Sequence, residues 1–135
     1  MKFKTLTGGL KRLPRTKNYL INWRKKSRSK RQFETKQFLK EYWKDHVVFE
    51  EFPVAGTKMT LDFYNANKKI AVEVQGDQHT KYVPFFHGRR GNFASQLRRD
   101  EKKLMFCKLN GIKLVEIYSK DTLDKSLFKK QGIHL

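Results

Sequence analysis

Between residues 47 and 75, apolar side chains alternate with polar ones in three short runs, at residues 47–52, 59–64 and 70–75. Pro53 closes the first run, and short turn-forming segments at residues 55–57 and 65–68 separate the three. Alternation with a period of two residues is typical of half-buried strands, and such turns join antiparallel neighbours. The pattern therefore predicts a three-stranded antiparallel meander.

A helical pattern precedes the meander. Residues 29–32 read Ser-Lys-Arg-Gln, which has the form of a capping box at a helix start. Apolar side chains then recur three or four residues apart and form one stripe, at Phe38, Leu39, Tyr42 and Trp43. This spacing predicts a helix over residues 31–45.

The rest of the chain alternates helix and strand. We expect a helix over residues 93–110, ended by Gly111, and an apolar strand over residues 112–118. Asp121 is the expected cap of a last helix that reaches about residue 130. A strand that follows a crossover helix joins its sheet in parallel. The order helix, meander, helix, strand, helix predicts an α/β fold with a small mixed sheet.

Two of the predicted strands carry a carboxylate inside an apolar run. Asp62 lies between Leu61 and Phe63, and Glu73 shares one face of its strand with Gln75. If the two strands pair, Asp62, Glu73 and Gln75 emerge together. Convergent carboxylates beside a polar group make a site for a hard cation such as Mg²⁺, which can activate water against a phosphodiester.

The net charge changes the picture. The chain of 135 residues has a formal net charge of +18, which implies a polyanionic partner, most simply nucleic acid. A ribosomal-type basic protein fits the charge equally well. The charge is concentrated at the start, because residues 1–31 carry +12 and the first acidic residue is Glu34.

We interpret residues 1–28 as a basic N-terminal arm that grips DNA, and residues 29–135 as the folded domain. A solvated tail and a transit peptide remain alternatives for the arm. Tyr19 and Trp23 are among its few apolar residues and can form a short helix or anchor. Removal of the arm is expected to flatten the salt dependence of binding while leaving the metal site intact. Its candidate DNA contacts are Arg12, Arg15, Lys17, Arg24, Lys25, Lys26 and Arg28.

The long polar segment over residues 76–92 interleaves aromatic and basic side chains. Aromatic rings can wedge between base steps and arginine can enter the minor groove, so we expect this loop to contact DNA through Lys81, Arg89 and Arg90. The alternative is a loop that its own phenylalanines fix to the core.

Other features narrow the class of protein. No apolar run reaches transmembrane length, and the first residues lack the apolar core of a secretory signal. A single cysteine, Cys107, excludes an internal disulfide and a cysteine-based zinc site. We therefore expect a cytoplasmic protein of a bacterial or phage-infected cell.

The order of elements and these residues resemble the PD-(D/E)xK nuclease superfamily, which has the restriction-endonuclease-like fold. Within it, the likeness is to small very-short-patch-repair-like members and to phage or homing endonucleases, over about residues 29–120. Residues 61–63 resemble the aspartate strand, and residues 73–75 resemble the (D/E)xK element with Gln75 in place of lysine. Residues 76–79 resemble the Gly-x-x-His that follows it, and Glu34 matches the helical glutamate.

The resemblance implies a Mg²⁺-dependent or Mn²⁺-dependent DNA endonuclease that cuts or nicks duplex DNA. By resemblance, Asp62 and Glu73 hold the metal with the carbonyl of Val74, Glu34 completes the shell or binds a second metal, and Gln75 orients the attacking water. His79 or Lys103 is the candidate to replace the missing lysine. Both also have plain structural readings, His79 as a hydrogen-bonding loop residue and Lys103 as the ion-pair partner of Asp100.

Three questions stay open. A non-catalytic nucleic-acid-binding or ribosome-associated protein fits the same composition, and a nuclease acting on RNA or branched DNA fits the same site. Cleavage of both strands would call for a homodimer or for two successive cuts.

Overall fold

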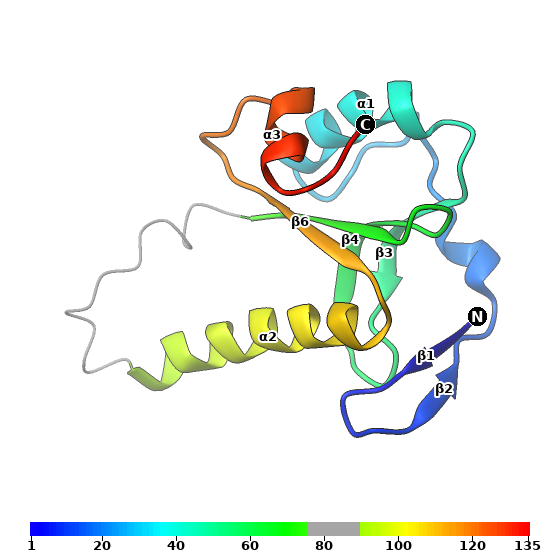
Figure 1. Cartoon of the computed structure of the whole chain (residues 1–135), viewed down its shortest axis with the longest axis vertical. Coiled ribbons are helices and arrows are strands. Elements are labelled where there is room, and N and C mark those ends of the chain that lie inside the picture. Colours follow the sequence, from blue (N-terminus) through cyan, green and yellow to red (C-terminus); the bar gives the residue numbers. More distant parts are fainter. Residues whose placement is uncertain (76–89) are drawn as a thin grey trace.

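A computed structural model describes residues 1–75 and 90–135, with side chains from residue 99 onward in the second range. The predicted fold class is confirmed, because the described chain is a mixed α/β fold (Figure 1). Its main sheet has the strand order β3-β4-β5-β6, formed by Val48–Pro53, Thr60–Asn65, Ile70–Val74 and Lys113–Ile117. The first three strands are the antiparallel meander, and β6 joins β5 in parallel.

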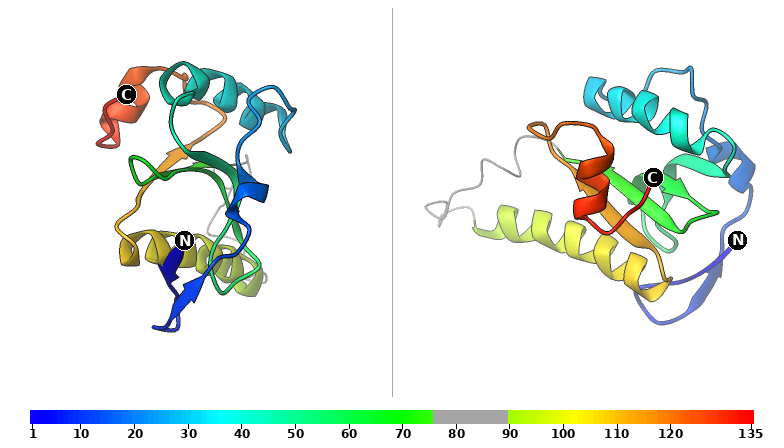
Figure 2. Two further views of the ribbon diagram at one scale, coloured as in Figure 1. Left: turned by 90° about the vertical axis from the view of Figure 1, so that its right-hand side faces the viewer. Right: turned by 45° about the horizontal axis from the view of Figure 1, so that its top comes forward.

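Helices cover both faces of this sheet (Figures 1 and 2). One face packs against α1 (Lys30–Trp43) and α3 (Lys125–Lys130), whose Leu39, Trp43 and Phe128 are fully or almost fully buried. The other face packs against α2 (Arg90–Leu109) through Phe106 and Cys107. Asp62 on β4 and Glu73 on β5 therefore lie in a sheet that is covered on both sides.

The predicted start of the first helix at Ser29 is confirmed, and the predicted start of the last helix needs correction. Ser29 caps α1 by accepting a 3.1 Å hydrogen bond from the Gln32 backbone, but the Gln32 side chain turns to strand β3 instead of back to Ser29. Asp124, and not Asp121, caps α3. Asp121 instead accepts from the Tyr118 backbone N–H, so its carboxylate is used in the turn that follows β6.

The basic N-terminal segment folds onto the sheet. Strands β1 (Lys2–Lys4) and β2 (Leu10–Arg12) form a hairpin, and η1 (Thr16–Tyr19) follows. Phe3 is 5% exposed, and its ring centroid lies 5.5 Å from that of Phe106 and 5.7 Å from that of Phe52. Residues 1–28 thus supply core side chains as well as positive charge.

No helix in the described ranges is long and apolar enough to cross a membrane.

Candidate active site

Asp62 and Glu73 meet on the neighbouring strands β4 and β5 and are locked to each other's backbone. The Asp62 N–H donates to Glu73 Oε2 at 2.7 Å, and the Val74 N–H donates to Asp62 Oδ2 at 2.8 Å. Asp62 is 8% exposed and Glu73 is 5% exposed. Because one oxygen of each carboxylate accepts a backbone hydrogen bond from the opposite strand, the sheet itself fixes the pair in position.

The two outer oxygens of this pair face cations. Lys103, on α2, donates to Glu73 Oε1 at 2.6 Å. Arg28 lies 3.6 Å from Asp62 Oδ1 and forms a closer ion pair with Glu51. Lys103 therefore pairs with Glu73 and not with Asp100, the partner that helix spacing suggested. An ammonium group thus reaches the carboxylates from the helix, while Gln75, two residues after Glu73, occupies the position where a lysine was expected.

Burial and mutual repulsion oppose ionisation of this pair. Desolvation, followed by the charge of Glu73, raises the pKa of Asp62 to about 7, and the Val74 N–H only partly opposes this. Burial also raises the pKa of Glu73, against the opposing effect of Lys103. Two buried carboxyl groups that share one site cannot both be comfortably ionised without a further proton or cation.

The donor set suits a small hard cation. Among residues 1–75 and 99–135, no three His, Cys, Asp or Glu side chains gather as a metal-binding group. Mg²⁺ needs fewer, because it is usually held by one or two carboxylates and keeps several of its waters. Asp62 and Glu73, with the Val74 carbonyl, are the residues that would hold it.

Two further carboxylates, Glu51 on β3 and Glu116 on β6, flank the pair, so that a row of acidic side chains crosses the sheet. The sequence pattern did not indicate either of them. Glu116 on β6 is in register with Glu73, and it accepts from the Tyr118 hydroxyl at 2.7 Å. Glu51 on β3 accepts from Thr60 at 3.0 Å, and its charge raises the pKa of Asp62. The parallel pairing of the last strand could have indicated Glu116. Glu51 has a φ of 53°, a break in the strand that alternation does not predict.

Gln75 and Glu34 are further predicted site residues whose side chains the structure describes. The Gln75 amide approaches Glu116 at 3.5 Å, at the outer end of the row. Glu34 is exposed on α1 and pairs with Arg31 at 3.5 Å. His79, Lys81 and Arg89, with the other residues of the range 76–89 that were predicted to contact DNA, lie outside the described residues, as does the side chain of Arg90.

A buried lysine, also unforeseen, anchors part of the basic segment. Lys36 is fully buried and donates to Glu50 at 2.7 Å and to the carbonyls of Asn22 and Lys25 at 2.9 and 2.6 Å. Its place on the buried face of α1, between Gln32 and Leu39, is the signal that could have found it. The candidate DNA contacts Arg24, Lys25 and Lys26 are therefore held at a fixed place; they are exposed, as are Arg12, Arg15 and Lys17.

The chain is similar in sequence to proteins of several viruses. The chain is 34% identical over 73 residues to Uncharacterized protein 307L of Invertebrate iridescent virus 6, which covers 53% of this chain and 37% of that protein. It is 42% identical over 66 residues to Uncharacterized protein 094L of Frog virus 3, covering 48% and 43%, and 31% identical over 87 residues to Uncharacterized protein 033L of Invertebrate iridescent virus 3, covering 64% and 45%.

The chain spans less than half the length of each of these relatives. No family model matches it, and no solved structure matches it.

Proposed function

We propose that the protein is a metal-dependent endonuclease that hydrolyses phosphodiester bonds in duplex DNA, with Asp62 and Glu73 as the metal-binding pair. The observation that carries the proposal is the reciprocal attachment of these two carboxylates to each other's strand, which holds them together although burial raises the pKa of both. Such an arrangement costs stability and is expected where a cation is to be bound.

The residues of the chain have separate tasks in this proposal. Asp62 and Glu73 hold the cation and leave lone pairs for it on their outer oxygens. Lys103 opposes the burial-raised pKa of Glu73 and brings a positive charge beside the place of a bound phosphate. Gln75 positions water as a neutral donor and acceptor. Glu34, exposed on α1, binds a second metal or a metal-bound water. The chemistry that bound Mg²⁺ supplies is stabilisation of negative charge on the phosphate and a more acidic bound water.

The test is cleavage of supercoiled plasmid with Mg²⁺ or Mn²⁺ against EDTA, followed by gel electrophoresis. Wild type should nick or linearise the plasmid only with the metal, and Asp62→Asn and Glu73→Gln should each abolish cleavage. Asp45→Asn and Glu41→Gln, at exposed positions, are matched controls that should retain it. Metal-independent cleavage, or cleavage that survives Asp62→Asn, would refute the proposal. A panel of single-stranded, branched and RNA substrates then fixes the substrate class.

A non-catalytic nucleic-acid-binding protein is the second candidate, and one observation favours it. Lys103 and Arg28 already face the outer oxygens of both carboxylates, as they would in a purely structural ion-pair network. Calorimetric titration with Mg²⁺ separates the two candidates. The nuclease proposal expects binding by wild type that Asp62→Asn removes, whereas a structural network gives no binding in either protein. The cytoplasm of an infected cell is the location that suits either function.

A further inference from the structure

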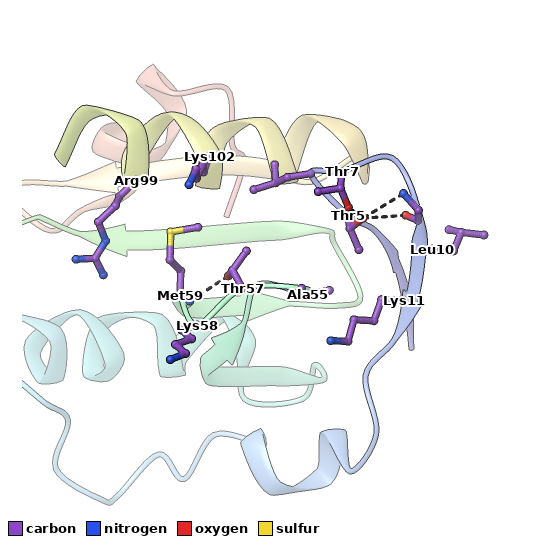
Figure 3. A pocket seen from close by; sticks show the side chains of 13 residues that line it. Thr5, Thr7, Leu10, Lys11, Ala55, Thr57, Lys58, Met59, Arg99 and Lys102 are labelled. Atoms are coloured by element: carbon purple, nitrogen blue, oxygen red, sulfur yellow. Dashed lines mark hydrogen bonds between the residues drawn. The ribbon is translucent and has the colours of Figure 1, made fainter. Parts of the chain in front are cut away.

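A cavity of about 730 Å³ lies between the β1–β2 hairpin, the β3–β4 turn and α2 (Figure 3). Four of its lining residues are cations and none is acidic; the cations are Lys11, Lys58, Arg99 and Lys102. All four side chains are exposed, and none forms an ion pair within the described residues. Positive charge is thus gathered from three separate segments around one hollow, where unbalanced like charges repel one another.

The lining of the cavity includes threonine hydroxyl groups that hydrogen bonds to the backbone hold in place. Thr57 donates to the Val54 carbonyl at 2.8 Å and accepts from the Met59 N–H at 3.0 Å. Thr5 accepts from the Gly9 N–H at 3.1 Å, and it packs against the Gly56 turn, where a Cβ would lie 3.5 Å from it. The two turns therefore brace each other, and the cavity is formed before any ligand arrives.

Two elements connect the lining of the cavity with the carboxylate pair and its lysine. Met59 lines the cavity and lies three residues before Asp62 on the same strand run, a distance of about 10 Å at the rise of a strand. Arg99 lies four residues before Lys103 on α2, about 6 Å along the helix axis. A polymer of phosphates that reaches the carboxylates can therefore also reach these cations.

We propose that this cavity, named here the hairpin pocket, binds the phosphate backbone of a nucleic-acid strand beside the scissile position. Lys11, Lys58, Arg99 and Lys102 contact the phosphates, and the β1–β2 hairpin acts as one wall of the pocket. The inference rests on the proposed function for the identity of the polymer. The inference goes beyond the proposed function because it assigns a binding site for a nucleic-acid strand. Of the parts that form this site, only the basic N-terminal segment was expected to contact DNA.

Fluorescence anisotropy of a labelled duplex DNA in EDTA tests the pocket without any cleavage. The double variant Lys58→Gln/Lys102→Gln is compared with Lys129→Gln/Lys130→Gln, which removes the same charge from exposed positions on α3 across the sheet. The pocket variant should bind roughly tenfold more weakly or worse at about 0.1 M salt, and its slope of log affinity against log salt should fall by about 1.8, at about 0.9 for each neutralised phosphate. The α3 variant should change affinity by less than about threefold.

Equal weakening in the two double variants would overturn the pocket, because net charge alone would then explain it. The same holds if ATP binds wild type and loses affinity in the pocket variant while duplex DNA does not, since the ligand would then be a free nucleotide. The pocket and the nuclease fail separately. A pocket effect without metal-dependent cleavage refutes the nuclease alone, and cleavage without a pocket effect refutes the pocket alone.

Discussion

Two lysine–glutamate pairs connect a helix to the main sheet, and they differ in how completely their charges are matched. Lys36 on α1 has three acceptors, and its partner Glu50 also accepts from Ser27 at 2.6 Å and from Gln32 at 3.0 Å. Lys103 on α2 meets Glu73, whose neighbour Asp62 carries a second buried carboxyl group. The first pair is satisfied in itself, whereas the second shares its site with Asp62, whose outer oxygen has only the more distant Arg28 at 3.6 Å.

The difference separates a structural ion pair from a candidate binding site. Both pairs are buried helix-to-strand contacts of the same two residue types, so neither residue type nor burial distinguishes them. The distinguishing property is the second carboxyl group, which raises the pKa of its neighbour and leaves room for a cation. Removal of a charge should therefore destabilise the first pair and can stabilise the second.

The largest effect on stability is expected at Lys36. Lys36→Met leaves Glu50 buried without its cation, so the free energy of unfolding should fall by about 3–5 kcal/mol. Denaturant unfolding measures it, with Lys40→Met, exposed one turn later on α1, as the control. A decrease below about 1 kcal/mol would place Lys36 in the same class as a surface lysine.

Asp62→Asn should change stability and activity in opposite directions. The amide oxygen can still accept from the Val74 N–H, while the repulsion by Glu73 and Glu51 disappears. We expect the free energy of unfolding at pH 8 without metal to rise by on the order of 2 kcal/mol. Cleavage should fall by roughly a hundredfold or more, because metal stabilisation is worth several kcal/mol. A destabilised variant would mean that the pair is structural.

The pH dependence of stability should carry the signature of Asp62. Its folded pKa of about 7 lies above the usual 3.8, so the folded protein binds the proton more tightly than the unfolded chain. The contribution of this group is therefore fully present below about pH 4 and is lost as the pH rises through about 7. The difference in unfolding free energy between wild type and Asp62→Asn should follow this curve, with a slope of at most about 1.4 kcal/mol per pH unit. Saturating Mg²⁺ should flatten it, and a flat difference without metal would contradict the raised pKa.

The smallest effect on stability is expected in the segment that Lys36 anchors. Replacing Arg24, Lys25 and Lys26 by glutamine removes exposed charge but leaves the carbonyl of Lys25 in place for Lys36. Stability should change by less than about 0.5 kcal/mol. The slope of log affinity for DNA against log salt should fall by about 0.9 for each phosphate that the segment no longer neutralises. An unchanged slope would show that this stretch does not bind the nucleic acid.

This triple variant is a sharper test of the basic segment than deletion of residues 1–28. Deletion would also remove Phe3 from the core, the two carbonyls that hold Lys36, and Arg28 beside Asp62. Deletion is therefore expected to disturb the surroundings of Asp62 as well as the salt dependence of binding. Basic composition did not reveal that a hairpin with one buried phenylalanine can attach such a segment firmly to a core.

Strand phasing was the part of the site that the sequence could predict. Alternation placed Asp62 and Glu73 on one face, and the order of elements predicted that the last strand joins the sheet in parallel, as β6 does beside β5. Of the partners from elsewhere in the chain, Lys103 was one of two candidates to replace the lysine, whereas its contact with Glu73 and the approach of Glu51 could not be predicted. Lys103 reaches Glu73 across thirty residues, and Glu51 joins the row through a positive φ that side-chain pattern does not encode. Local periodicity thus gives the face of a residue, while its partners depend on how the layers pack.

Asn110, at the end of α2, has a consequence for hydrogen exchange. Its side chain accepts from the Lys4 N–H at 2.8 Å and donates to the Lys4 carbonyl at 3.0 Å, as a neighbouring strand would. An amide at the edge of a two-stranded hairpin ordinarily exchanges fast with solvent. The Lys4 amide should instead exchange only when α2, with Lys103, separates from the hairpin. A single backbone proton therefore reports how often the hairpin, one wall of the pocket, detaches from the end of α2.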